Sequence, residues 1–496
     1  MSVKSSTCDS SQPLRFWRRG EIVCVSNVTP ERTLLELLRE DLRACDTKEG
    51  CAAGDCGACT VVVADSPDGE HLNYRAINSC IRPAHAIDGL ALWTAADLPS
   101  PDGTLHPVQQ ALVDQHATQC GFCTPGFVMS LFSLYQRTVA RGRAPTETEI
   151  HDALSGNLCR CTGYRAILDA ARQLGQMATA LAVPGGDEST LAHQLRTLPA
   201  RNNAQADYAL PTTLNELLQL RASRPEAQLI AGATDAGLWI TQGLQRMPSI
   251  IDLTRVQALR AVERYPHHLA IGAAVPLQEA FEALAQDRPA ITAFAQRFAG
   301  WPIRQSGTLA GNVANGSPIG DAMPLLLALD AHLVLMAWRD GRQVHREVPL
   351  ADFYTGYRQN VMARDEVLAW IKVAHPQRHE WLGLYKIAKR VEDDISAVCL
   401  ALRIEGEGGQ LHTVRIGVGG VAATPARALQ TESVMQGQPD EARIWTQARD
   451  TLAGEFSPLS DLRASSHYRR RVLHNLMERA RLERRGEPHI RLEALA

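Results

Sequence analysis

Four cysteines near the start of the chain have a spacing that suits a small inorganic cluster. Cys51, Cys56 and Cys59 follow the pattern C-x4-C-x2-C, and Cys80 comes after a longer gap. This is the plant-type ligand spacing of a [2Fe–2S] cluster. The residues between the first three cysteines are Gly, Ala or Asp, so the loop can wrap a cluster and direct backbone N–H groups at its sulfurs. The spacing favours iron–sulfur over structural zinc, which commonly uses two short C-x2-C pairs.

A second group of four cysteines follows in a stretch with helical periodicity. Cys120 and Cys123 form C-x2-C, and Cys159 and Cys161 form C-x-C. Two helical hairpins would each place one cysteine pair at the turn. Bringing the two turns together would gather four thiolates at one end of a four-helix bundle. These patterns also suit zinc, so zinc stays an alternative to a second iron–sulfur cluster in this group.

Length and charge exclude several broad classes of protein. The chain has 496 residues, which is enough for about three or four domains. Its formal net charge of −3 gives no general attraction to nucleic acid or to anionic lipid. The longest apolar stretch, residues 322–338, is interrupted by Pro324 and Asp330, so we expect buried core rather than a membrane span.

Cysteine usage points to metal or redox chemistry. Of the 12 cysteines, only Cys399 lies beyond residue 161. The N-terminus shows no apolar signal segment, so we expect a cytoplasmic chain, where a disulfide framework is disfavoured. Cys8 and Cys24 are expected to be inert, and Cys45 has the wrong spacing to join the first group.

The elements around the first group predict a small mixed sheet with one helix. Residues 14–25 read as a hairpin turning at Arg19-Gly20, and residues 33–42 as a short amphipathic helix. A β-branched strand, 60–63, follows Cys59 directly, which places the cysteine loop at the edge of the sheet.

Around the second group the pattern predicts four helices. The first runs from Pro107 to about His116. The second has Thr124 as N-cap with Pro125 at the first helical position and ends near Gly142. The third starts with a capping box at residues 146–149 and stops at Gly156, and the fourth covers residues 164–181. A polar stretch from Pro184 to about Asp207 should then run over the surface as a link between domains.

Two glycine-rich segments in the remaining chain suit a pyrophosphate. Residues 229–237 follow a probable strand, and residues 307–312 lead into a further Gly-, Ser- and Asn-rich run. Glycines beside short hydroxyl side chains expose backbone N–H groups to phosphate. A third segment, 417–422, fits G-x-G-x-x-A, but Pro425 follows, so those glycines cannot open a helix and we reject a dinucleotide site there.

Three strings in the cysteine-rich part carry a family resemblance. CAAGDCGACT, QCGFCTPG and GNLCRCTGY, in this order, resemble the molybdenum hydroxylases, the xanthine dehydrogenase and aldehyde oxidase family. The resemblance implies a multidomain α+β chain with a β-grasp ferredoxin-like domain, a four-helix-bundle [2Fe–2S] domain, a two-part α+β FAD-binding domain and a C-terminal α+β domain. The expected boundaries are 10–95, 96–182, a linker over 183–207, 208–381 and 382–488. The resemblance also implies two [2Fe–2S] clusters, one held by Cys51, Cys56, Cys59 and Cys80 and one by Cys120, Cys123, Cys159 and Cys161.

By the same resemblance, FAD contacts fall in both accepted glycine segments and at scattered positions further on. The implied flavin-contact residues are Leu229, Ile230, Ala231, Gly232, Ala233, Thr234, Asp235, Ala236, Phe298, Thr308, Leu309, Ala310, Gly311, Asn312, Asp321, Leu368 and Lys386. Tyr357 matches a position on the nicotinamide side.

The resemblance further implies an oxidoreductase whose substrate site lies elsewhere. Its domains account for nearly all of residues 14–488, so we expect no residue for substrate hydroxylation here and a molybdopterin-binding large subunit as partner, in a heterotetramer of two small and two large subunits. The fused arrangement is similar to the electron-transfer subunit of bacterial family members that oxidise hypoxanthine and xanthine to urate with NAD+ as acceptor. A related aldehyde or N-heterocycle hydroxylase and a stand-alone iron–sulfur flavin reductase are the alternatives.

Overall fold

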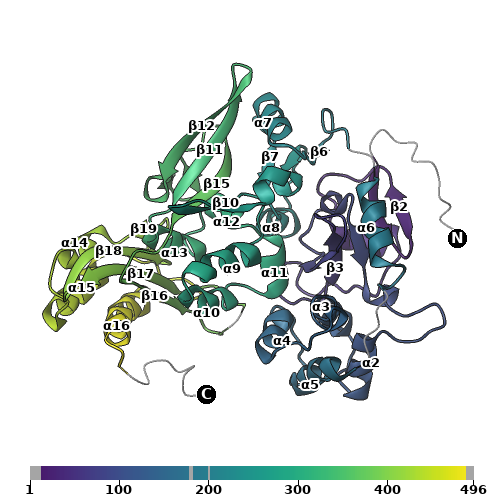
Figure 1. The fold of residues 1–496 in the computed structure, drawn as a ribbon, viewed down its shortest axis with the longest axis horizontal. Coiled ribbons are helices and arrows are strands. Elements are labelled where there is room, and N and C mark those ends of the chain that lie inside the picture. The colour runs from purple at the N-terminus through teal and green to yellow at the C-terminus, as the bar shows by residue number, and fades with distance from the viewer. Residues whose placement is uncertain (1–12, 178–182, 199–200, 392, 488–496) are drawn as a thin grey trace. The chain divides into compact units, whose positions relative to one another are not determined.

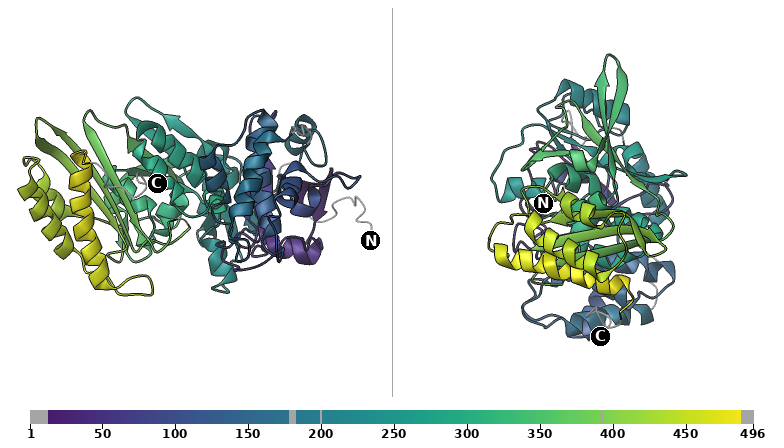
Figure 2. Two further views of the ribbon diagram at one scale, coloured as in Figure 1. Left: turned by 90° about the horizontal axis from the view of Figure 1, so that it is seen from below. Right: turned by 90° about the vertical axis from the view of Figure 1, so that its left-hand side faces the viewer.

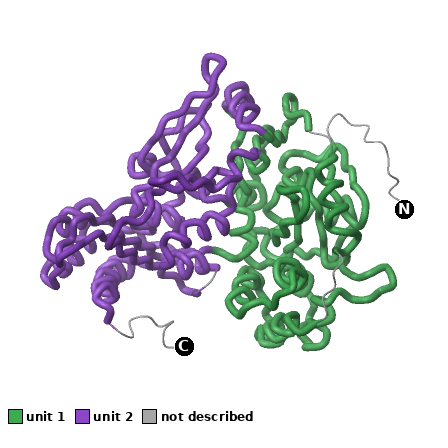
Figure 3. The backbone as a smooth tube through the Cα atoms, in the orientation of Figure 1, with its two compact units in different colours: residues 1–212, 226–255, 299–307 green, residues 213–225, 256–298, 308–496 purple. Residues whose placement is uncertain are grey.

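The chain folds into two compact units. The structure, a computed structural model, describes residues 13–177, 183–198, 201–391 and 393–487. Unit 1 contains residues 1–212, 226–255 and 299–307, and unit 2 contains residues 213–225, 256–298 and 308–496 (Figure 3). The segment predicted to bind FAD therefore contributes to both units.

Unit 1 begins with a five-stranded mixed sheet of order β2-β1-β5-β3-β4. The predicted hairpin is confirmed, because β1 pairs antiparallel with β2 from Leu14↔Val25 to Arg18↔Glu21. The helical segment begins at the N-cap Thr33, whose side chain forms a capping box with Glu36. The strands and helices are β1 (Leu14–Arg18), β2 (Glu21–Val25), α1 (Leu34–Glu36), η1 (Leu37–Asp41), β3 (Thr60–Asp65), β4 (Asn73–Asn78), η2 (Ala84–Ile87), β5 (Ala91–Trp93) and η3 (Ala95–Asp97).

The second part of unit 1 is the predicted four-helix group, α2–α5, which Figure 1 shows at the lower right. Its members are α2 (Pro107–Asp114), α3 (Thr124–Arg137), α4 (Glu147–Leu154) and α5 (Arg165–Gln173), with short 3-10 turns η4 (Val139–Arg141) and η5 (Leu174–Gln176). Helix α3 is the central one, since its residues from Gly126 to Gln136 are all buried. The capping box of Thr146 and Glu149 that opens α4 is confirmed.

One predicted helix start in this group is wrong. Cys123, not Thr124, is the N-cap of α3, and the Thr124 hydroxyl instead shares a 2.7 Å hydrogen bond with Thr118. Because Cys123 keeps a helical backbone conformation, the helix starts at the cysteine turn itself. Helix α5 ends at Gln173 and tightens into η5, while the predicted end at Leu181 lies outside the described residues.

The segment predicted as a surface link contains a helix, α6 (Glu188–Arg196). Asp187 caps it, and its Leu191 and Ala192 are buried in the same apolar cluster as Trp17 and Trp93 of the sheet. A small parallel sheet of order β6-β8-β7 follows, and α11 from later in the chain also belongs to unit 1. These elements are β6 (Tyr208–Ala209), β7 (Gln228–Ile230), α8 (Ala236–Thr241), β8 (Ile250–Asp252), η6 (Leu253–Arg255) and α11 (Trp301–Ser306).

Unit 2 contains a five-stranded antiparallel sheet of order β12-β11-β15-β10-β9. The apolar stretch 322–338 forms α13 and most of β11 and is largely buried, so the prediction of a core segment is confirmed. The elements here are α7 (Leu214–Ser223), η7 (Gln257–Arg260), β9 (Val262–Arg264), β10 (His268–Gly272), α9 (Leu277–Asp287), α10 (Ala290–Gln296), α12 (Leu309–Asn315), α13 (Ala322–Ala328), β11 (His332–Arg339), β12 (Arg342–Pro349), η8 (Leu350–Asp352), β13 (Tyr354–Gly356), β14 (Gln359–Asn360) and β15 (Val367–Ala374).

A four-stranded antiparallel sheet, β16-β17-β18-β19, completes unit 2, with three helices over one face (Figure 2). Its elements are β16 (Glu380–Ile387), β17 (Val398–Glu407), β18 (Gln410–Gly419), β19 (Ala426–Arg427), α14 (Leu429–Met435), α15 (Ala442–Glu455) and α16 (Ser466–Arg484). Gly417 lies inside β18, where a Cβ would come within 2.0 Å of the Pro324 carbonyl oxygen of α13. The glycine therefore permits close packing, and the rejection of a dinucleotide loop there is confirmed.

A buried histidine in the helical group makes stability depend on pH. The His106 ring caps α2, because its Nδ1 accepts from the Val108 amide at 3.3 Å, and burial lowers its pKa to about 4. The unfolded chain binds this proton near pH 6.5, so stability is full above that pH and is lost as the pH falls toward 4. We expect His106 to account for a loss of about 3 kcal/mol of unfolding free energy over this range.

Denaturant titrations at pH 7 and pH 4.5 of the wild type and of His106→Asn measure this contribution. Asn can cap a helix without titrating in this range, so the variant should lose less stability on acidification. An equal loss in both proteins would contradict the assignment to His106.

Candidate cofactor sites

The first cysteine group converges as predicted. Three of its members lie in the loop before β3, and Cys80 follows β4. The Sγ atoms of Cys59 and Cys80 are 3.2 Å apart, and the Cys51 thiol makes side-chain hydrogen bonds with Cys56 and Cys80. Cys59 and Cys80 are buried, while Cys51 and Cys56 keep partial exposure. All four sulfurs thus share one small space at the edge of the sheet.

The loop directs backbone N–H groups at these sulfurs. The amides of Ala53 and Cys56 both donate to Cys51 Sγ at 3.4 Å. The loop curls this tightly because Ala52, Gly54 and Gly57 all have positive φ angles, a conformation that glycine adopts without strain. Such bonds stabilise negative charge on sulfur, which suits thiolate ligands.

Crowding of the sulfurs displaces their pKa values in opposite directions. Hydrogen bonds from Cys56 and Cys80 lower the pKa of Cys51 far below its usual range. The hydrogen bond that each makes to Cys51 raises the pKa of Cys56 and of Cys80. A bound cation favours the thiolate form of cysteine, so a cationic cluster would suit four sulfurs this close together.

The second cysteine group is assembled from the turns before α3 and α5. The Cys123 thiol hydrogen-bonds Cys159, and the Cys161 thiol hydrogen-bonds Cys120, so each turn contributes one partner to each pair. Burial and the bond to Cys159 raise the pKa of Cys123 to about 12. Thr162 supports Cys159, whose Sγ accepts from its hydroxyl at 3.2 Å and from its amide at 3.4 Å. Unlike the first group, this one is open to solvent at Cys120 and Cys161.

Both donor sets fit iron–sulfur clusters, because each offers four sulfurs and hydrogen-bond donors beside them. Among the described residues, no group of three or more His, Cys, Asp or Glu side chains is arranged to hold a single metal ion. The assignment of the eight ligands therefore rests on the sulfur–sulfur contacts and the spacing. Of the other cysteines, Cys24, predicted to be inert, is disulfide-bonded, and Cys8 lies outside the described residues.

The two cysteine loops touch each other directly. The Leu158 amide, next to Cys159, donates to the Cys56 carbonyl at 2.9 Å. Asn157 Nδ2 donates to the Gly57 carbonyl at 3.2 Å, and a Cβ on Gly57 would lie 2.3 Å from the Gly156 carbonyl oxygen. The loops can approach this closely because residue 57 is a glycine, and the contact holds the two sulfur groups next to each other.

The first glycine segment, 229–236, joins β7 to α8 within unit 1. Together with α8, it contacts the two residues that follow Cys80. Arg82, two residues after Cys80, donates from Nη1 to the Gly232 carbonyl at 2.9 Å. A Cβ on Gly237 of α8 would lie 2.1 Å from the Ile81 carbonyl oxygen. Gly232 itself has φ +85° and packs against Ser306 at the end of α11. The segment predicted to cradle the FAD pyrophosphate thus contacts the strand end that carries Cys80.

Helix α11 is itself fixed to the helical group. The Trp301 amide donates to the Ser155 hydroxyl at 3.0 Å, and the Arg137 guanidinium lies 4.4 Å above the Trp301 ring. Arg304, which is fully buried, forms an ion pair with Asp152 of α4. The backbone that borders Gly232 is therefore held by the domain that carries the second cysteine group.

In unit 2 the second glycine segment starts a short helix. Thr308 caps α12, and its hydroxyl accepts from the Gly311 amide at 2.9 Å. Asp321 and Lys386 come together as a buried ion pair of 2.8 Å, which Ser396 completes with a 2.5 Å hydrogen bond to Asp321. Sequence reasoning found the first two but missed Ser396, since no local signal links it to a residue 75 positions earlier.

The other predicted flavin-contact residues of unit 2 lie on different elements. Phe298 is buried at the end of α10 with its ring 5.3 Å from Phe281. Leu368 is buried in β15, opposite Leu335. Tyr357 lies between β13 and β14 and is 58 % exposed, so its ring is accessible to a dissociable ligand.

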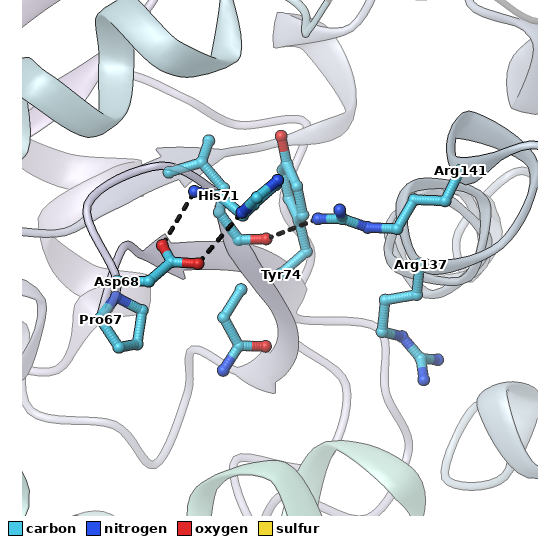
Figure 4. Close-up of a pocket in the computed structure, with 8 residues that line it drawn as sticks. Pro67, Asp68, His71, Tyr74, Arg137 and Arg141 are labelled. Carbon is cyan, nitrogen blue, oxygen red and sulfur yellow. Dashed lines mark hydrogen bonds and ion pairs between the residues drawn. The ribbon is translucent and has the colours of Figure 1, made fainter.

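A pocket of about 340 Å³ lies elsewhere in unit 1, between the turn after β3 and the end of α3 (Figure 4). It is lined by Pro67, Asp68, His71, Leu72, Asn73, Tyr74, Arg137 and Arg141. Its charged groups are already paired, because Asp68 binds His71 at 3.1 Å and Arg141 donates to the Leu72 carbonyl at 3.2 Å. None of the predicted site residues lines this pocket.

Comparison with known protein families covers most of the chain. Residues 19–85 match a 2Fe-2S iron–sulfur cluster binding domain and residues 94–172 match a [2Fe-2S] binding domain. Residues 202–376 match the FAD binding domain in molybdopterin dehydrogenase, and residues 383–484 match the CO dehydrogenase flavoprotein C-terminal domain. The chain belongs to the molybdenum hydroxylase family. Two [2Fe–2S] domains and an FAD-binding domain are therefore present, as the resemblance implied.

Several curated proteins are similar to this member of the family. Xanthine dehydrogenase of Drosophila subobscura is 34% identical over 89% of this chain and 37% of its own length. Xanthine dehydrogenase of Emericella nidulans is 32% identical over 88% of this chain and 36% of its own. Xanthine dehydrogenase/oxidase of Gallus gallus is 29% identical over 90% and 38%. The chain thus spans little more than a third of the length of these relatives.

Solved structures share the fold. A carbon monoxide dehydrogenase from Hydrogenophaga pseudoflava matches with a TM-score of 0.52 at 24% identity, over 55% of this chain and 94% of that chain. Quinoline 2-oxidoreductase from Pseudomonas putida 86 matches with a TM-score of 0.51 at 23% identity, over 56% and 97%. These likenesses confirm the predicted multidomain α+β class. No helix among the described residues is long and apolar enough to cross a membrane.

Glycine at position 232 is predicted to be essential for the shape of the first glycine segment. In Gly232→Ala the Cβ would lie 1.9 Å from the Ser306 carbonyl oxygen, and alanine would be strained at φ +85°. We expect a loss of about 3 kcal/mol of unfolding free energy from backbone strain and overpacking together, and loss of bound FAD. Denaturant titration and the flavin absorbance of the purified chain measure the two effects.

Gly103→Ala is the matched control, because Gly103 has φ +87° and no neighbour within 4 Å of its Cβ position. It should show only the backbone strain, about 1 kcal/mol, and should keep its FAD. Equal losses in the two variants would show that the contact with Ser306 does not matter.

Proposed function

We propose that this chain is the electron-transfer subunit of a xanthine dehydrogenase. It would pass electrons from a molybdenum cofactor on a partner subunit through two [2Fe–2S] clusters to FAD and then to NAD+. The observation that carries the proposal is the contact between three sites in unit 1, in which the second cysteine loop bonds the first and the first glycine segment bonds the strand end with Cys80. Centres held this close can exchange single electrons.

The close approach of the thiols in each group supports the proposed ligand residues. Cys51, Cys56, Cys59 and Cys80 would hold one cluster, and Cys120, Cys123, Cys159 and Cys161 the other. When bound, the clusters carry one electron at a time and FAD exchanges electrons singly or as a hydride. The chain's own part is to hold these groups, to donate N–H bonds to thiolate sulfur and to shield the buried Cys59 and Cys80 from water.

The FAD contacts would come from the two glycine segments and the residues of unit 2. In the second segment, the helix N-terminus at Thr308 and the backbone N–H groups after it suit a phosphate. The buried pair of Asp321 and Lys386 offers a charge-paired polar group for the flavin. Tyr357, exposed between two short strands, is proposed for the nicotinamide side.

The exposed second cysteine group is the proposed entry point for electrons. Cys120 and Cys161 are exposed, and the large apolar side chains beside the group, Phe122, Leu158 and Tyr164, are 48 %, 45 % and 37 % exposed. Exposed apolar side chains gathered at one place favour a protein partner. A molybdopterin-binding subunit is proposed as that partner, in a heterotetramer, and purines as its substrates, because the similar curated proteins are named xanthine dehydrogenases.

The isolated chain separates this proposal from its alternatives. Expressed alone, it should reduce an artificial dye with NADH and should oxidise neither hypoxanthine nor xanthine, because it holds the flavin but not the substrate site. Steady-state assays with NADH and with each purine measure this. Purine oxidation by the isolated chain would contradict the partner proposal, and dye reduction without any binding to a molybdopterin subunit would favour a stand-alone flavin reductase.

Removing one ligand should remove one cluster. We expect Cys123→Ser to lose about half of the iron and one of two electron paramagnetic resonance signals, with FAD retained, because the first group and the glycine segments are untouched. Cys45→Ser is the control, since this exposed thiol lies outside both groups. Two intact signals in Cys123→Ser would show that Cys123 is not a ligand.

A further inference from the structure

The peptide group between Ala52 and Ala53 links a residue of the FAD-binding domain to a cluster ligand. Its N–H, on Ala53, donates to Cys51 Sγ at 3.4 Å. Its C=O, on Ala52, accepts from the Thr241 hydroxyl at 2.8 Å and from Gln242 Nε2 at 3.1 Å. Both donors stand at the end of α8, in the part of the chain that matches the FAD-binding family model. The C=O of this peptide thus accepts two hydrogen bonds from α8, while its N–H donates one to the sulfur of Cys51.

The backbone holds this peptide in a conformation that costs energy. Ala52 has φ +51°, the left-handed region that residues with a Cβ rarely occupy. That geometry turns the Ala52 carbonyl toward α8 and the Ala53 amide toward Cys51. A strained backbone conformation is kept only when surrounding contacts hold it in place. Here the two hydrogen bonds from α8 to the Ala52 carbonyl do so.

Helix α8 cannot easily move away from this peptide. Gly237 packs on Ile81 with no room for a side chain, and Leu238 packs against the cluster of buried residues that includes Cys59 and Cys80. Arg82 fixes the start of the segment through the Gly232 carbonyl. The Thr241 hydroxyl is therefore held at a defined place relative to the ligand loop.

Hydrogen bonds in a chain polarise one another. A donor on the carbonyl of an amide makes its N–H a stronger donor, by about 10–30% per bond. An N–H bond to a ligand sulfur stabilises the reduced cluster more than the oxidised one, because reduction adds negative charge, and so it raises the reduction potential.

We propose that Thr241, assisted by Gln242, raises the reduction potential of the cluster held by Cys51 through the Ala52–Ala53 peptide. The inference rests on the proposed function, since it requires that the first cysteine group holds a cluster. Thr241 acts through the peptide and is a positioning residue. The flavin-binding segment would thereby set part of the driving force for electron transfer toward its own cofactor.

The test is a redox titration of the full-length chain followed by electron paramagnetic resonance. Thr241→Val keeps the shape of the side chain and removes the donor, so the midpoint of the first cluster should fall. We expect a shift of about two- to fourfold in the one-electron equilibrium, which at about 59 mV per tenfold is about 20–35 mV. The second cluster, which α8 does not contact through this peptide, serves as the internal reference and should keep its midpoint.

Two further variants keep the test decisive. Thr241→Ser retains the hydroxyl and should restore the wild-type midpoint. Gln242→Met removes the second donor from a more exposed position and should give a smaller fall in the same direction, even if Thr241→Val loses its cluster. Iron and FAD content of each variant are measured beside the titration.

The outcomes separate this inference from the proposed function. An unchanged first midpoint in iron-loaded Thr241→Val and Gln242→Met, or equal shifts of both clusters, would overturn the role of the peptide. A wild-type chain that binds no iron would overturn the proposed function and this inference with it.

Discussion

Four thiolates can share a space a few ångströms wide only when positive charge lies between them, because like charges in close contact resist ionisation together. The first cysteine group shows this constraint directly. Hydrogen bonds between its sulfurs lower the pKa of Cys51 and raise the pKa values of Cys56 and Cys80. The small-residue loop, its positive φ angles and its inward N–H groups all serve to hold negative charge at one point.

In unit 1, glycines allow the segments around the first cysteine group to pack closely against it. Gly57 lets the two cysteine loops approach until the Leu158 amide donates to the Cys56 carbonyl. The glycines at 232 and 237 let the FAD-binding segment lie against α11 and against Ile81. Each close approach uses a residue without a Cβ, so the spacing between the cofactor sites depends on glycine at these three positions. A glycine-to-alanine change at one of them would therefore alter the distance between two sites while leaving every ligand residue in place.

The sequence alone allowed the sites to be predicted wherever chemistry is encoded by local spacing. Both cysteine groups, the capping box at Thr146 and the sheet around β3 needed only neighbours in the chain. The N-cap of α3 was misplaced by one residue, because Thr124 is a good capping residue but its hydroxyl bonds Thr118 instead. Helix α6 was missed because most of its residues are polar, and its three buried residues are explained only by packing against the sheet.

Contacts between residues far apart in the chain could not be predicted from local spacing. The bond from Thr241 to Ala52 joins residues 189 positions apart, and Ser396 reaches Asp321 across 75. Neither Thr241 nor Ser396 lies in a motif, and a lone hydroxyl carries no signal of its partner. Gly417 shows the reverse case, since a motif-like glycine run turned out to serve only the close packing of α13 on β18.

Eight thiols that hold two iron–sulfur clusters beside a flavin would determine the composition of the purified protein. Metal, acid-labile sulfide and flavin analysis of the anaerobically purified chain measures that composition. We expect about four iron atoms, about four sulfides and one flavin per chain, with two distinct paramagnetic signals after reduction. Colourless protein with zinc in place of iron would contradict this expectation.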